Sequence, residues 1–219
     1  MLKAVLLDLD GVITDTAAYH YLAWKELGSE IGIEIDSEFN EQLKGVSRME
    51  SLDRILRHGG KAHAFTLEEK LGLAAKKNAR YVQLLEGITP ADIYPGIEGL
   101  LVELREAGVY AVLASASKNA PQILASLRLT EYFDYIVDPD EVAYGKPAPD
   151  MFLRGAAAVS VSPGQCIGIE DAQAGIEAIK AAGMIAVGIG SGGLLSAAGA
   201  DVVLPTTETL SLAFLQLLL

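Results

Sequence analysis

Short apolar runs rich in β-branched residues alternate along the chain with longer segments in which apolar residues recur at helical spacing. Uninterrupted short apolar runs are typical of strands buried on both faces, and the longer periodic segments are typical of helices that cover them. The predicted strands span residues 3–10, 109–117, 135–140, 165–171, 184–190 and 201–205. The predicted helices between them span residues 97–108, 121–129, 149–160 and 172–183. This alternation predicts an α/β fold with a Rossmann-like parallel sheet covered on both faces.

The alternation is interrupted between the first and second predicted strands. Residues 15–87 have helical periodicity and contain no convincing strand, and GITPADIYPG (87–96) is a Pro- and Gly-rich connection back to the sheet. We therefore predict an inserted all-helical domain at residues 15–87, and a sheet core made of residues 1–14 and 88–219.

Composition and charge restrict the possible partners. The chain has 219 residues, 51% of them hydrophobic, which is enough for a large core. Its formal net charge of −12 argues against nucleic acid or an anionic membrane as a partner, because binding either one requires a basic face. Small anionic substrates stay possible, since a few local bases can outweigh the global charge. The single cysteine, Cys166, excludes an internal disulfide and suits a reducing compartment, and it is expected to be a buried apolar side chain rather than a reactive thiol.

The two ends of the sequence resemble neither a signal peptide nor a membrane anchor. Asp8 and Asp10 come before any signal-peptide core could form, and the apolar run 210–219 is about half the length of a membrane span. We expect this last run to pack on the core as a helix or strand. We also expect a cytoplasmic protein, and a monomer, since no exposed apolar face requires a second copy.

Polar side chains gather where the predicted strands end, and the carboxyl ends of parallel strands form the ligand-binding edge of such a sheet. Capping and turn formation are alternative roles for each of them taken singly, because Asp-Gly pairs form turns, Ser and Asn cap helices, and acids favour the first helical turn. Capping and turn formation alone do not explain why acids, hydroxyls and a lysine follow several strands at the same edge of the sheet. The residues are Asp8, Asp10, Ser115, Ser117, Lys118, Asn119, Lys146, Glu170 and Asp171.

These residue types in combination point to phosphoryl transfer. Converging carboxylates require a hard cation, and oxygen ligands close to a phosphate favour Mg²⁺. A serine, a lysine and the N–H groups of a helix N-terminus can hold a phosphoryl group. A carboxylate beside that group can attack phosphorus, and a second carboxylate can move a proton to or from the sugar or water oxygen.

The same segments resemble the signature motifs of the haloacid dehalogenase superfamily of phosphotransferases. DLDGVITDT (8–16) resembles the first motif, Ser115 the second, Lys146 the third and Glu170-Asp171 the fourth. Dehalogenating members lack the second aspartate, so Asp10 groups the chain with phosphatases and phosphomutases. An insertion directly after the first motif implies the helical-cap subclass, in which residues 15–87 would be the cap domain.

More narrowly, nearly the whole chain resembles the β-phosphoglucomutase family. The similar segments are VITDTAAYHYLAWK, EQLKGVSRMES, YPGI, LASASKN, GKPAPD and IGIEDAQAGI. The resemblance implies a Mg²⁺-dependent phosphomutase acting on sugar phosphates. It would interconvert β-D-glucose 1-phosphate and D-glucose 6-phosphate through β-glucose 1,6-bisphosphate and an aspartyl phosphate on the enzyme. A sugar-phosphate or phosphoglycolate phosphatase of the same superfamily is the alternative, because its core residues would be identical.

The resemblance also implies roles for residues of the core. Asp8 would be the nucleophile and a metal ligand, and Asp10 the general acid and base, with its backbone carbonyl on the metal. Asp171 would be the third protein ligand, with Glu170 beside it. The residues implied to bind the transferred phosphoryl group are Ser115, Ala116 and Lys146, with Ser117, Lys118 and Asn119 along the same rim.

In the cap, Arg48 would bind the distal, non-reacting phosphate. His20 and Lys77 would transmit cap closure to Asp10. The other implied residues are Thr16 at the hinge, Trp24 beside the sugar, and Lys44, Gly45, Val46, Ser47 and Ser51 on the sugar side. Without the resemblance, Ser47 and Glu50 fit a purely structural capping box, and His20 and Lys77 would be ordinary packed or solvated side chains.

Overall fold

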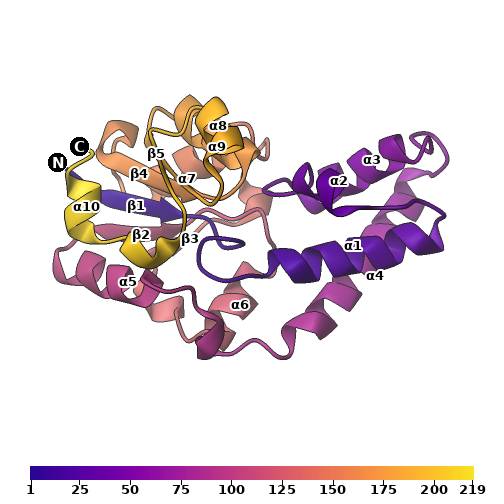
Figure 1. Ribbon diagram of the computed structural model, residues 1–219, viewed down its shortest axis with the longest axis horizontal. Coiled ribbons are helices and arrows are strands. Elements are labelled where there is room, and N and C mark those ends of the chain that lie inside the picture. Colours follow the sequence, from indigo (N-terminus) through magenta and orange to yellow (C-terminus); the bar gives the residue numbers. More distant parts are fainter.

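The computed structural model describes all 219 residues. It has a lobe built on a parallel sheet, which carries both chain ends, and a second lobe built from helices α1–α4 (Figure 1). The strands are β1 (Ala4–Leu7), β2 (Tyr110–Leu113), β3 (Tyr135–Ile136), β4 (Cys166–Glu170), β5 (Ile185–Ile189) and β6 (Val202–Leu204). The helices are α1 (Ala17–Glu30), α2 (Ser37–Glu41), α3 (Arg48–His58), α4 (Leu67–Leu85), α5 (Ile97–Glu106), α6 (Ala120–Ser126), α7 (Asp150–Ala158), α8 (Gln173–Ala181), α9 (Gly192–Ala197) and α10 (Leu212–Gln216).

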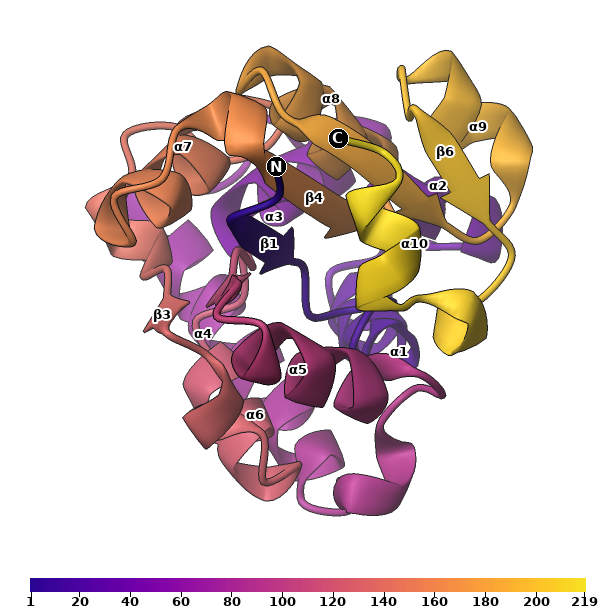
Figure 2. The same cartoon turned by 90° about the vertical axis from the view of Figure 1, so that its left-hand side faces the viewer.

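Every strand pairs in parallel, in the order β3-β2-β1-β4-β5-β6. Successive side chains of β1 enter two separate apolar clusters, because side chains alternate between the faces of a strand. Val5 and Leu7 pack with residues of α5, α6 and α10, whereas Ala4 and Leu6 pack with residues of α7, α8 and α9. The two sets of helices lie on opposite sides of the sheet in Figure 2. The predicted parallel sheet covered on both faces is therefore confirmed.

The sequence overestimates the strand lengths in a consistent way. The apolar runs continue past the last paired residue, so Asp8 and Ser115 lie just beyond β1 and β2 in the structure. The predicted strand 135–140 keeps only two paired residues, since the chain enters a 3₁₀ turn at Pro139. Helix α9 was not predicted, because Gly192 and Gly193 weaken its helical signal.

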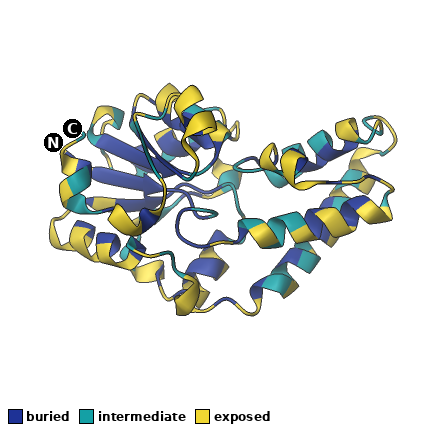
Figure 3. Cartoon of the chain, viewed as in Figure 1, coloured by how far each residue is buried: buried dark blue, intermediate teal, exposed yellow.

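The helical lobe has its own apolar cluster, separate from the two clusters of the sheet. Its helices are buried on their inner faces and exposed on their outer faces (Figure 3). Two chain segments join the lobes, one around residues 13–16 and the other around residues 88–96. They are hydrogen-bonded to each other: Thr14 Oγ1 donates to the Asp92 carbonyl (2.8 Å), and the Tyr94 N–H donates to the Ile13 carbonyl (2.9 Å). The domain boundaries at residues 14/15 and 87/88 stay a prediction.

The apolar C-terminal run forms α10, which packs against α5 as expected for a terminal helix. No helix combines the length and the apolar character needed to cross a bilayer.

Cys166 should not react with a thiol reagent in the native protein at pH 8. Its side chain is buried in the sheet, and burial raises the pKa of the thiol to about 11, so the reactive thiolate is scarce. The measurement is the absorbance released from a disulfide reagent, with and without denaturant. We expect one thiol to react only after unfolding, and rapid reaction of the folded protein would contradict this assignment.

Candidate active site

The first and fourth motifs meet because β1 and β4 are neighbours in the sheet. The Asp8 N–H continues the pairing past the strand end and donates to the Ile169 carbonyl (3.0 Å). This register brings the carboxyl group of Asp8 to those of Glu170 and Asp171. One carboxylate oxygen from each of the three lies within 4.8 Å of the others. The predicted convergence of acids at the sheet edge is thus present.

Lys146 lies at the base of this cluster. Its buried Nζ donates to Asp8 Oδ1 and to Glu170 Oε2, at 2.6 Å each. Burial alone would lower the pKa of Lys146, but the charges of Asp8 and Glu170 outweigh this and hold the pKa above its usual value. Lys146 therefore carries a permanent positive charge beside Asp8.

The donor set of this cluster fits a hard divalent cation. Burial, and then the charge of Asp8, raise the pKa values of both Glu170 and Asp171, so these acids resist ionisation without a further positive charge. Two glycines let the carboxylates approach the backbone: a Cβ at Gly11 would lie 2.2 Å from Asp171 Oδ2, and one at Gly175 would lie 2.0 Å from Glu170 Oε2. Oxygen ligands of this kind suit Mg²⁺, Mn²⁺ or Ca²⁺.

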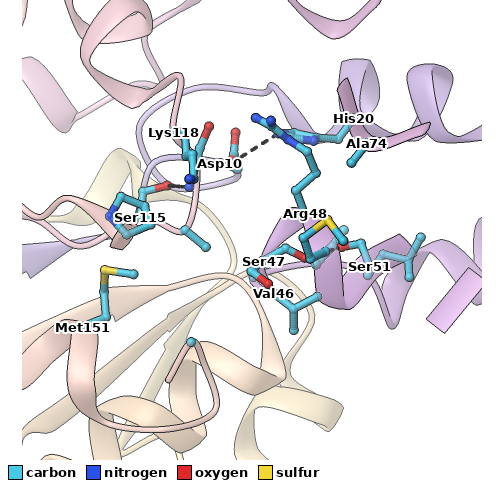
Figure 4. A pocket seen from close by; sticks show the side chains of 18 of the residues that line it. Asp10, His20, Val46, Ser47, Arg48, Ser51, Ala74, Ser115, Lys118 and Met151 are labelled. Carbon is cyan, nitrogen blue, oxygen red and sulfur yellow. Dashed lines mark hydrogen bonds and ion pairs between the residues drawn. The ribbon is translucent and has the colours of Figure 1, made fainter. Parts of the chain in front are cut away.

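Asp10 lies outside this cluster, as expected if only its backbone carbonyl is a ligand. Its Oδ1 is buried without a hydrogen-bond partner, and its Oδ2 lies 3.9 Å from His20 Nε2 (Figure 4). Burial, and then the charge of Asp8, raise the pKa of Asp10 to about 8. Asp10 thus holds a proton at neutral pH more readily than an exposed aspartate, which suits a residue that donates one.

His20 and Lys77 are in contact, with 2.6 Å between His20 Nδ1 and Lys77 Nζ. The ammonium of Lys77 is buried between the rings of Trp24 and Tyr81, 4.7 Å from each ring centre. Burial and the charge of Arg48 lower the pKa of Lys77 to about 7, and burial and Lys77 hold the pKa of His20 well below its usual range. The alternative in which Lys77 is a solvated lysine is therefore wrong.

A cavity of about 470 Å³ opens above the carboxylates, between the strand ends and the helical lobe. Arg48 extends into it from the start of α3, toward His20 and Asp10 (Figure 4). Its guanidinium makes no ion pair within the protein, and burial lowers its pKa from the usual value. The predicted site residues that line the cavity are Asp8, Asp10, His20, Trp24, Lys44, Gly45, Val46, Ser47, Arg48, Ser51, Lys77, Ser115, Ala116, Ser117, Lys118 and Asp171.

Four predicted site residues do not line this cavity. Lys146 and Glu170 lie beneath its floor and act on it through Asp8. Thr16 is fully buried just before α1, with its hydroxyl lacking a partner. Asn119 points away from the cavity and donates to Asn78 Oδ1 on α4 (2.9 Å).

The structure also decides among the capping alternatives. Ser47 caps α3 by accepting the N–H of Glu50, but the carboxylate of Glu50 binds Arg54 and Arg57 rather than returning to Ser47, so the capping box is incomplete. Asn119 precedes α6 without capping it through its side chain. Glu170 accepts the N–H groups of Asp171 and Ala172 (3.2 Å each) while also binding Lys146, so it has both a structural and an electrostatic role.

Several lining residues were missed by sequence reasoning. Leu71, Ala74 and Ala75 of α4 form one wall, and Val142 and Ala143 form part of another. Leu71 lies three and four residues before Ala74 and Ala75, and Ala74 lies three residues before Lys77, so helical spacing could have indicated these three. Nothing in the sequence distinguishes the last two, which lie on an irregular loop.

Comparisons with known proteins agree with this geometry. A sequence model of the family described as haloacid dehalogenase-like hydrolase matches residues 2–183. A β-phosphoglucomutase from Bacillus subtilis (strain 168) is 50% identical over 215 residues, which is 98% of this chain and 94% of that protein. The crystal structure of β-phosphoglucomutase (pgmB) from Clostridium difficile matches with a TM-score of 0.96 and 48% identity, over 99% of this chain and 96% of that one. The fructose-1-phosphate phosphatase YqaB of Escherichia coli (strain K12) is 32% identical over 188 residues, 84% of this chain and 95% of that protein.

A parallel sheet with clustered acids and a lysine at its carboxyl edge, matched by that family model, defines a haloacid dehalogenase-like hydrolase, and the chain belongs to this family. Within it, the near-complete alignment at about half identity places the chain in the β-phosphoglucomutase family.

Proposed function

We propose that the protein is a β-phosphoglucomutase, which interconverts β-D-glucose 1-phosphate and D-glucose 6-phosphate through β-glucose 1,6-bisphosphate. The observation that best supports this proposal is the arrangement of Asp8 and Arg48 around the cavity. Asp8 lies on its sheet side, while the unpaired guanidinium of Arg48 enters from the helical side. A sugar bisphosphate carries a second phosphate that such a guanidinium would bind, and hydrolysis of a monophosphate requires no second binding group.

In this proposal the chain transfers the phosphoryl group through Asp8. A carboxylate oxygen of Asp8 attacks phosphorus, the bond from phosphorus to the sugar oxygen breaks, and Asp10 protonates that leaving oxygen. Applied to the bisphosphate, this step leaves a sugar monophosphate and phosphorylated Asp8. In the second step, the free hydroxyl of β-glucose 1-phosphate, bound in the opposite orientation, gives its proton to Asp10 while its oxygen takes the phosphoryl group and the bond from phosphorus to Asp8 breaks. This second step forms the bisphosphate again. Lys146 remains charged beside Asp8 throughout and stabilises the negative oxygens.

Asp8, Asp171 and the backbone carbonyl of Asp10, with Glu170 beside them, would hold Mg²⁺. When bound, the cation supplies positive charge that offsets the phosphoryl oxygens and the carboxylates. The other proposed roles belong to residues in the walls of the cavity. Ser115 and Ala116 hold the transferred phosphoryl group, the segment Lys44–Ser47 together with Ser51 and Trp24 encloses the sugar, and Lys77 positions His20 against Asp10.

The alternative is a phosphatase acting on a sugar phosphate or phosphoglycolate. It is supported by the 32% identical relative that is named a fructose-1-phosphate phosphatase. The distinguishing experiment measures the rate at which β-glucose 1-phosphate is consumed in the presence of Mg²⁺, with and without a trace of the bisphosphate. A phosphomutase should be slow until the bisphosphate is added, because the bisphosphate transfers a phosphoryl group to Asp8 and so makes the active phosphoenzyme. A rate that does not depend on the bisphosphate, with fructose 1-phosphate or phosphoglycolate consumed faster, would favour the phosphatase.

Arg48→Ala should lower kcat/KM for the bisphosphate by about 100-fold, the size of a lost charge-assisted pair of hydrogen bonds. Hydrolysis of p-nitrophenyl phosphate, which has no distal phosphate, should change much less. Arg57→Ala on the same helix is the control, because that guanidinium is exposed and paired with Glu50. Equal losses of both activities in Arg48→Ala would contradict the distal-phosphate role.

A further inference from the structure

A continuous series of hydrogen bonds leads from the phosphoryl-binding loop to the helical lobe. The Ser115 hydroxyl accepts the N–H of Ser117 (3.2 Å), and the Ser117 hydroxyl accepts the N–H of Asn119 (3.3 Å). The side-chain Nδ2 of Asn119 then donates to Asn78 Oδ1 on α4, at 2.9 Å. This last bond joins α4 of the helical lobe to the loop that follows β2.

The position of Asn78 on α4 gives this bond a particular significance. Lys77, the preceding residue, contacts His20, and His20 faces Asp10. Neighbouring residues of α4 are therefore linked to both halves of the site. Asn78 contacts the serine loop after β2, and Lys77 reaches the proposed proton-transfer residue after β1 through His20. In Figure 1, one end of α4 comes near α6, the helix that Asn119 precedes.

We propose that Asn78 is a positioning residue, which couples closure of the helical lobe to the conformation of the loop 115–119. The inference rests on the proposed phosphomutase function. By accepting the hydrogen bond from Asn119, Asn78 holds the lobe against the loop while the phosphoryl group is on Asp8, and so excludes water. The amide pair is neutral, so it holds the lobe closed without competing with the cationic side chains for phosphate. A single neutral hydrogen bond is also weak enough to open in every turnover.

The central test compares Asn78→Leu, which removes the acceptor, with Asn78→Asp, which keeps an acceptor oxygen at the same place. The measured quantity is the ratio of inorganic phosphate released to glucose 6-phosphate formed. We expect Asn78→Leu to raise this ratio about fivefold, the effect of one neutral hydrogen bond, and Asn78→Asp to stay within about twofold of the unchanged protein. Gln83→Leu, an exposed position on the same helix, is the control and should have no effect.

Two further measurements make the test decisive. In an Asn119→Ala background, Asn78→Leu should raise the ratio no further, because the partner of Asn78 is already gone. Amide hydrogen exchange in residues 115–120 should be faster in Asn78→Leu than in Asn78→Asp or the unchanged protein, and this readout requires no reaction. An unchanged ratio and unchanged exchange in Asn78→Leu would overturn the proposal, as would equal defects in Asn78→Leu and Asn78→Asp. If the unchanged protein itself released one phosphate per sugar, the phosphomutase function would fail, and the exchange measurements would still decide the role of Asn78.

Discussion

Asp8→Asn is expected to lower turnover of β-glucose 1-phosphate by about 10⁴-fold or more, because the amide cannot attack phosphorus. Hydrolysis of p-nitrophenyl phosphate should be lost in parallel, since both reactions use the same nucleophile. The protein should remain folded. The asparagine Oδ1 can still accept from Lys146, and the variant removes one of three mutually repelling carboxylates. Steady-state rates with both substrates, together with the thermal unfolding midpoint, provide the measurements.

Asp53→Asn is the matched control for Asp8→Asn, because Asp53 pairs with Lys70 on the outside of the helical lobe. It should leave both activities unchanged. Full activity in Asp8→Asn would refute the assignment of Asp8 as nucleophile. A variant that lost only the mutase reaction would place Asp8 in substrate positioning instead.

Lys146→Met should lower the free energy of unfolding by about 3–5 kcal/mol in the presence of a chelator, because it leaves buried carboxylates without their cation. Lys146 donates at 2.6 Å to both Asp8 and Glu170, and all three side chains are buried. The loss should be largest near pH 8 and smaller near pH 5. The pKa of Glu170 is already raised in the native protein, and losing the lysine charge should raise it further above its value in the unfolded chain. As the pH falls, the folded state therefore binds a proton at Glu170 before the unfolded state does. This preferential binding stabilises the folded state at low pH.

Urea denaturation at both pH values measures this effect. Lys118→Met is the control, because Lys118 pairs with Asp140 on the surface and its loss should cost less than about 1 kcal/mol. Equal stability of Lys146→Met and Lys118→Met, or a larger loss at pH 5 than at pH 8, would contradict the buried-network account.

The sheet and its functional edge could be predicted from the sequence because both depend on local pattern and on strand order. Asp8 and Glu170 each end an apolar run, and the general rule for parallel sheets brings such ends together. Lys146 was expected at this edge from the sequence pattern, whereas Arg48 was indicated by the family resemblance alone. Lys146 lies against Asp8 and Arg48 lines the cavity, and their roles stay predictions.

What could not be predicted depends on packing between distant segments. Whether Lys77 is solvated or buried is decided by Trp24 and Tyr81, which surround it only once α1 and α4 pack together. The pairing of Asn78 with Asn119 joins residues 41 positions apart, and neither residue type signals its partner. Lining residues on irregular loops, such as Val142, likewise leave no periodic pattern.

The central claim is that Asp8 passes its phosphoryl group to a sugar hydroxyl rather than to water. The most direct measurement supplies β-glucose 1-phosphate, Mg²⁺ and a trace of the bisphosphate, and follows glucose 6-phosphate and inorganic phosphate in the same reaction by ³¹P NMR. The account predicts that glucose 6-phosphate accumulates while inorganic phosphate remains a small fraction of it. Release of inorganic phosphate at the rate of sugar turnover would contradict the account.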